Sequence, residues 1–147
     1  MYNVEKSIGF LLAKAYQRTF ALFREELEEF DLTPPQYAIL AFLWQQDGLT
    51  QVELSEKSQV DRTTIGGLID RLEKLGMVER HTHPHDRRAY QIRLTQRGKS
   101  LEPQLRECSK NALAKLTSGL NDNDIAELVR ILEILRGETR IYEKPTF

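Results

Sequence analysis

Cysteine is almost missing from this chain, since only Cys108 occurs among its 147 residues. A single cysteine excludes an intrachain disulfide and agrees with a reducing compartment. The chain also lacks any run of about 18 apolar residues, and its first ten residues lack the basic start and apolar core of a secretory signal. We therefore expect a cytoplasmic protein that makes no contact with a membrane.

Motifs of the common enzyme classes are absent as well. The sequence contains no P-loop, no GxSxG, no HExxH and no paired-cysteine motif. We therefore expect that the protein is not an enzyme and uses no cofactor. With 147 residues, of which 40% are hydrophobic, the chain is long enough for one domain with a true core. We expect a single domain over residues 1–147.

The net charge is small, but the charges are unevenly distributed. The formal net charge is −1. From Ser55 to Lys99, ten basic residues stand against six acidic ones, which leaves eleven basic and sixteen acidic residues elsewhere. This asymmetry predicts a basic working surface on an acidic body. Ordinary variation of surface charge is the alternative, and charge alone does not separate the two.

Long stripes of apolar residues lie at both ends of the chain. Residues 7–30 carry apolar side chains every three or four positions, which predicts a helix about 36 Å long. Similar stripes over 101–116 and 125–135 predict two more helices, capped by Thr95 and Asn121. These helices are longer than a small globule needs, so we expect them to pack against a partner, and residues 141–147 to form a tail.

Clear start signals predict three shorter helices in the middle of the chain. Thr33 with Gln36, and Thr50 with Glu53, form capping boxes that open helices near residues 34 and 51. A third helix is predicted over 62–75. Asp61 suits its N-cap, and Gly76 suits the left-handed residue that ends it.

The chain then changes to an alternating pattern. Tyr90, Ile92 and Leu94 alternate with polar residues, and Val78 starts an earlier extended run. The pattern predicts a two-stranded hairpin with its tip near residues 84–88. A helix-turn-helix over 50–75 followed by a hairpin over 77–95 is typical of a winged DNA-binding domain.

A helical wheel separates the two sides of the 62–75 helix. Its apolar residues face the core, and its other side and first turn are free to enter the major groove, where the first residues reach base edges. An ordinary solvated face is the alternative, because Asp70 and Glu73 dilute the positive charge. The candidate DNA contacts on this helix are Arg62, Thr63, Thr64, Gly67 and Lys74.

Two adjacent glycines interrupt this predicted recognition helix. Gly66 and Gly67 cost about 2 kcal/mol of helix stability relative to alanine. Either they let the helix backbone approach DNA closely, or Gly66 relieves crowding against a neighbouring helix. The sequence leaves both interpretations open.

The predicted hairpin tip carries an acid and two arginines. Arginine suits the negative potential of a narrow minor groove, and Asp86 can orient Arg88 through a charge-assisted hydrogen bond. A surface ion pair of little energetic weight is the alternative. Because the tip follows a helix-turn-helix, we assign DNA contact to His85, Asp86, Arg87 and Arg88.

All three histidines of the chain, His81, His83 and His85, lie near this tip. On a straight strand His81 and His85 would be about 13 Å apart, too far to share one zinc ion with bonds of about 2.1 Å. We therefore expect no metal site. Protonation of His85 beside the arginines would instead add positive charge near phosphate, which predicts tighter DNA binding at lower pH.

With these motifs the chain resembles the MarR (multiple antibiotic resistance regulator) family of winged-helix transcription factors. The resemblance is carried by LTPPQYAIL, by TQVELSEKSQVDRTTIGGLIDRLEKLGMVER and by DRRAYQIRLTQRG, which matches the family's DxR wing pattern. It implies a mainly α fold with a small β-wing, in which residues 33–95 form the winged helix-turn-helix. Residues 7–30 and 96–140 would be dimerisation helices of a homodimer on a pseudo-palindromic site in double-stranded DNA.

The resemblance also implies a repressor that a small molecule, frequently an aromatic acid, releases from DNA. Arg88 would enter the minor groove with Asp86 as its support, and the residues from Arg62 to Thr64 would start the recognition helix. The effector cleft would lie between the dimer helices and the winged domain. Its candidate residues are Tyr16, Thr19 and Tyr37, although aromatic residues at helical spacing more often belong to a core.

Two other functions stay open at this point. One is redox sensing through Cys108, although a cysteine in an apolar stripe is usually an inert core residue. The other is a winged helix that binds protein and has no affinity for DNA, against which the basic DRR tip argues.

Overall fold

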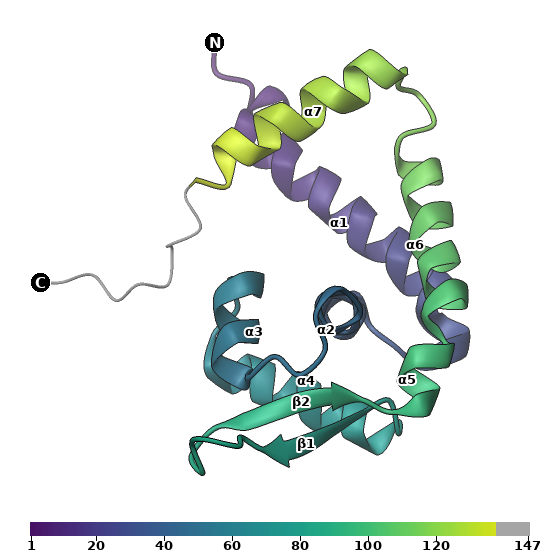
Figure 1. Ribbon diagram of the computed structural model, residues 1–147. Helices are drawn as coiled ribbons and strands as arrows, with labels where there is room; N and C mark the ends of the chain where they lie inside the picture. Colours follow the sequence, from purple (N-terminus) through teal and green to yellow (C-terminus); the bar gives the residue numbers. More distant parts are fainter. Residues whose placement is uncertain (138–147) are drawn as a thin grey trace, which may run out of the picture.

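The computed structural model describes residues 1–137, in which long helices stand apart from a group of shorter helices and one hairpin (Figure 1). The predicted helix end at 138–140 and the predicted tail at 141–147 lie outside the described residues. The long helices are α1 (Ile8–Leu27), α6 (Glu102–Leu116) and α7 (Asp122–Leu135). The remaining elements are α2 (Pro34–Gln45), α3 (Gln51–Ser58), α4 (Arg62–Lys74), β1 (Val78–Thr82), β2 (Tyr90–Leu94) and α5 (Gln96–Ser100), with short 3-10 turns at Val4–Lys6 and Glu28–Phe30.

The predicted helix starts are confirmed by the hydrogen bonds that cap them. Capping boxes open α2, α3 and α7, with Thr33, Thr50 and Asn121 as the N-cap residues. Asp61 caps α4, and Gly76 follows that helix with a φ of +71°. Each cap satisfies backbone N–H groups that have no partner inside the helix, which explains why these positions were readable in the sequence.

One predicted helix is divided in two. The stripe after Thr95 suggested a continuous helix, but α5 ends at Ser100 and α6 begins at Glu102. Pro103 lies in the first turn of α6. Since proline has no backbone N–H to donate to the preceding turn, it favours a new helix start at this point.

A single apolar core holds the short helices and the hairpin together. From α4 it takes Ile65, Ile69 and Leu72, each fully buried, as the helical wheel predicted. The same cluster includes residues of α2, of α3 and of the base of the hairpin, and it extends to buried residues of α1 and α6. The side of α4 opposite to these residues is therefore turned outward.

The hairpin is antiparallel, with Val78 opposite Leu94 and Thr82 opposite Tyr90. The segment before α3 pairs with its second strand, because Ile92 N–H donates to Leu49 O at 2.8 Å. The wing is therefore anchored to the start of α3, and only its tip at residues 83–89 extends beyond the paired strands.

The long helices leave apolar side chains uncovered in this chain. On α1 the exposed apolar residues include Ile8, Leu11 and Tyr16. α7 is amphipathic but has no buried residue, and in Figure 1 it lies at the opposite end of the molecule from the hairpin. None of the helices described within 1–137 has the length and apolarity to cross a bilayer.

A tight packing contact connects the hairpin to the long helices. Gly98 of α5 packs so tightly on the segment between α4 and β1 that a Cβ at this position would lie 2.1 Å from Met77 O. Its carbonyl accepts a hydrogen bond from Trp44 Nε1 at 3.0 Å, and Thr95 Oγ1 donates to Gly76 O at 2.6 Å. Only glycine fits this position.

We therefore predict that Gly98→Ala destabilises the protein by about 1–3 kcal/mol, the usual cost of overpacking. Gly67→Ala is the matched control, because a Cβ there meets nothing within 4 Å. Alanine should leave stability unchanged or raise it by up to about 1 kcal/mol at this helical position. Urea unfolding at one protein concentration measures the stability of both variants. Equal free energies of unfolding for the two variants would contradict the tight contact at Gly98.

Candidate nucleic-acid interface and an adjoining cavity

The outward side of α4 gathers the candidate DNA contacts. Its exposed residues include all five that the sequence indicated, namely Arg62, Thr63, Thr64, Gly67 and Lys74. They extend from the first turn to the last turn of one helix, beside the hairpin. An exposed helix side and the hairpin that packs against this helix therefore lie next to each other.

Asp61 organises the start of this helix. Its Oδ1 accepts the Thr64 N–H at 2.8 Å, and its Oδ2 accepts the Thr64 hydroxyl at 2.8 Å. These hydrogen bonds, the backbone one first, lower the pKa of Asp61 below its usual value. Because the Thr64 hydroxyl donates its proton to Asp61, its oxygen is left as an acceptor for a donor outside the chain.

The glycine pair on α4 is not required by packing within the chain. A Cβ at Gly66 would lie 3.7 Å from Gln51 Nε2, an ordinary van der Waals contact, and one at Gly67 would meet nothing within 4 Å. The interpretation that Gly66 relieves crowding is therefore wrong.

The wing tip is shaped by hydrogen bonds to Asp86. Its Oδ1 accepts the backbone N–H of Arg88 at 3.0 Å, and its carbonyl accepts the Ala89 N–H at 3.1 Å. The predicted charge-assisted hydrogen bond between Asp86 and Arg88 is therefore present, and it is made to the backbone N–H of Arg88 within a tight turn. Arg87 and Arg88 are both exposed at the tip.

The histidines contribute to the same turn. His83 Nδ1 accepts the backbone N–H of His85 at 3.1 Å, while His81 Nε2 lies 3.0 Å from Glu79 Oε2. Within residues 1–137 no three His, Cys, Asp or Glu side chains are grouped to hold a metal ion. His85 is exposed beside the arginines of the tip.

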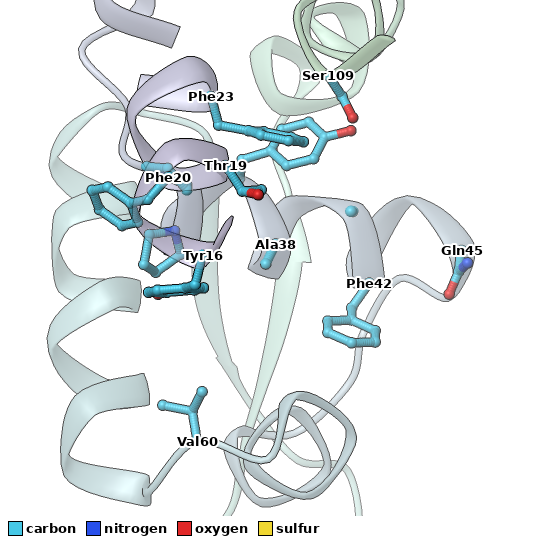
Figure 2. A pocket seen from close by; sticks show the side chains of 13 residues that line it. Tyr16, Thr19, Phe20, Phe23, Ala38, Phe42, Gln45, Val60 and Ser109 are labelled. Carbon is cyan, nitrogen blue, oxygen red and sulfur yellow. The ribbon is translucent and has the colours of Figure 1, made fainter. Parts of the chain in front are cut away.

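A cavity of about 530 Å³ lies between α1 and α2 (Figure 2). Tyr16, Thr19 and Tyr37, which the sequence indicated as effector residues, all line it. The sequence did not indicate its other walls, although the α1 residues among them follow the same apolar stripe. These further lining residues are Phe20, Phe23, Pro34, Pro35, Ala38, Ala41, Phe42, Gln45, Val60 and Ser109.

Two cationic side chains lie next to this cavity, not in it. Of the residues described, those that line the cavity carry no charged side chain. A second cavity of about 270 Å³ shares Pro35, Ala38, Phe42 and Val60 with the first, and Lys57 and Arg136 also line it. The two cationic side chains come from α3 and from the end of α7.

Cys108 is placed where an inert thiol is expected. Its side chain is buried in the core, at 6% exposure. Burial raises its pKa, and the negative charges of Glu26 and Glu29 raise it further. Since the thiolate is the reactive form, this environment opposes oxidation, and the redox alternative gains no support from it.

Comparison with known proteins identifies the family. The model of the MarR family matches residues 32–90. The transcriptional repressor NicR of Pseudomonas putida is 33% identical over 92% of this chain and 84% of its own length. The chain belongs to the MarR family. It is also 30% identical to the regulator YsmB of Bacillus subtilis, over 94% of this chain and 92% of YsmB.

The fold agrees with solved structures of similar proteins. BpsR of Bordetella bronchiseptica, whose DNA binding is regulated by 6-hydroxynicotinic acid, superposes with a TM-score of 0.87 at 26% identity. The match covers 94% of this chain and 99% of BpsR. The predicted family and the predicted fold, mainly α with a small β-wing, are confirmed. MarR-family proteins are transcriptional regulators, a class distinct from enzymes.

The lowered pKa of Asp61 predicts a pH-dependent contribution to stability. A carboxylate whose pKa is lower in the folded state stabilises the fold above its unfolded pKa of about 4, and this contribution is lost as pH falls through the folded pKa. Asp61→Asn keeps an acceptor for the Thr64 N–H but removes the charge. We expect the variant to be less stable at pH 7, and its deficit to shrink as pH approaches 3 in urea unfolding. A deficit independent of pH would contradict the assignment.

Proposed function

We propose that this protein is a homodimeric, sequence-specific transcriptional repressor that binds a pseudo-palindromic operator in the cytoplasm and is released by a small aromatic acid. The observation that carries the proposal is the exposed side of α4 beside an arginine-bearing wing tip, in a chain similar to the repressor NicR. The fold buries the apolar side of α4, which leaves the polar side to meet DNA.

In this proposal each DNA contact has its own role. The first turn of α4, from Arg62 to Thr64, reads base edges in the major groove. Lys74 and Arg87 bind phosphate and supply most of the affinity, while Arg88 enters the minor groove. Asp86 supports Arg88 through the backbone turn, and a protonated His85 adds positive charge.

Gly67 has a separate role in the same surface. A side chain at this position would project into open space from the exposed side of α4. Its absence leaves the helix backbone bare at a central point of the surface. We assign Gly67 to close approach between this backbone and DNA, which the helix tolerates at a cost of about 1 kcal/mol.

The homodimer follows from the uncovered apolar faces. α7 has no buried residue, and Ile134 and Leu135 remain 65% and 54% exposed. A two-fold dimer covers such faces on both subunits with the same contact. It also places two recognition helices at a fixed separation, which a pseudo-palindromic operator requires.

The cavity between α1 and α2 is assigned to the effector. Its aromatic walls suit a planar ring, and Tyr16, Thr19 and Ser109 offer hydroxyl groups. A carboxylate requires a cation, which Lys57 and Arg136 provide across the adjoining cavity. Lys57 lies on α3 and Arg136 follows α7. An anion bound between them therefore favours one placement of the winged domain relative to the long helices.

The wing assignment predicts that Arg88→Ala weakens operator binding by about 1–3 kcal/mol. Arg24→Ala, which removes an exposed arginine from α1, is the matched control and should bind as the wild type does. Mobility shift with DNA from upstream of the protein's own gene measures both affinities. An unchanged affinity and footprint for Arg88→Ala would contradict the assignment.

The effector assignment predicts that 6-hydroxynicotinic acid raises the melting temperature and releases operator DNA. The corresponding amide has the same ring without the negative charge, so it should act more weakly. Lys57→Gln should reduce the difference between acid and amide. If neither compound nor a panel of benzoic acids shifts the melting temperature or the DNA affinity, aromatic acids are not the effector class.

A further inference from the structure

The side chain of Arg80 joins three elements around the recognition helix. Arg80 lies on β1, and its Nε donates to Gln51 Oε1 of α3 at 3.1 Å. Its Nη2 donates to the backbone carbonyl of Gly66 at 3.2 Å, and its Nη1 lies 2.7 Å from Asp70 Oδ1 and also contacts the Glu73 carboxylate. One guanidinium therefore links the wing strand, the start of α3 and the middle of α4.

This arrangement requires arginine. A guanidinium has five N–H donors in a rigid planar fork, so it reaches acceptors in several directions at fixed angles. Lysine keeps the charge but concentrates its donors at one point on a flexible chain. Only a guanidinium can make the contacts with Gln51, Gly66 and Asp70 at the same time.

The contacts also change the electrostatics of the recognition helix. Asp70 and Glu73 are the acids that dilute the positive charge of α4. Arg80 contacts both, so that three charged groups carry a net charge of −1 in place of the −2 of the two carboxylates alone. The repulsion between α4 and a DNA phosphate is correspondingly weaker.

The same contacts contribute little to the stability of the fold. The side chains of Asp70 and Glu73 are 62% and 35% exposed, whereas that of Arg80 is 21% exposed. Solvent screens ion pairs with such exposed partners, and their net contribution is small. The bonds between Arg80 and its partners therefore matter more for the orientation of α4 than for folding.

We propose that Arg80 is a positioning residue for DNA recognition, which holds α4 at a fixed angle to the wing and offsets its two carboxylates. The inference rests on the proposed function, since it assumes that α4 and the wing contact DNA together. A residue that only binds phosphate weakens specific and non-specific binding about equally. A positioning residue instead lowers the ratio of specific to non-specific affinity, because only the specific complex needs both elements in register.

The test compares Arg80→Met and Arg80→Lys with Arg93→Met in the full-length protein. Arg93 is the matched control, an exposed arginine on the facing strand whose guanidinium donates to Gln91. The dissociation constants are measured for upstream DNA and for a scrambled duplex at fixed salt, and melting temperatures are recorded. We expect both Arg80 variants to lose at least about tenfold in the affinity ratio, and Arg93→Met to keep it.

Neutralising the two acids separates charge from geometry. The triple variant Arg80→Met, Asp70→Asn, Glu73→Gln should recover affinity for scrambled DNA but not the affinity ratio. Equal losses on both duplexes, or an Arg80→Lys protein with the wild-type ratio, would overturn the positioning role. If wild-type protein fails to distinguish the two duplexes, the proposed function itself fails, which is a separate outcome.

Discussion

The burial of one side of α4 is the constraint on which the rest of the structure depends. Ile65, Ile69 and Leu72 enter the core together, and the helix cannot roll about its axis without exposing them. Moving such side chains into water costs roughly 1.5–3 kcal/mol each, so the outward side of α4 is defined strictly. The candidate DNA surface is the consequence of this packing.

The wing and the long helices are placed relative to α4 by two different kinds of contact. On one side the guanidinium of Arg80 ties the hairpin to α3 and α4 through directional hydrogen bonds. On the other side Gly98 allows α5 to lie directly on Met77, between α4 and β1, and its carbonyl accepts a hydrogen bond from Trp44. A shift of α6 would therefore be passed to α4 and the wing through the tight contact at Gly98, which has little room to deform.

The cavity between α1 and α2 lies where such a shift can be influenced. Its walls belong both to a long helix and to the winged part of the chain, and α1 packs along α6. A molecule in this cavity contacts both parts at once, which is the condition for preferring one relative placement over another. Cys108 is not among the residues that line this cavity, and its thiol is buried in the core.

The sequence by itself determined the helix starts, the hairpin and the exposed side of α4, because caps and apolar periods depend on residues within a few positions of each other. It also indicated the residues of the wing tip and a hydrogen bond between Asp86 and Arg88, while the structure showed that this bond is made to the Arg88 backbone. Pro103 is a local signal for the division of α5 from α6, which the apolar stripe alone did not reveal. Only the tertiary structure decided the contacts of Arg80, the need for Gly98 and the walls of the cavity. These depend on contacts such as that between Gln51 and Arg80, 29 residues apart, which no local pattern encodes.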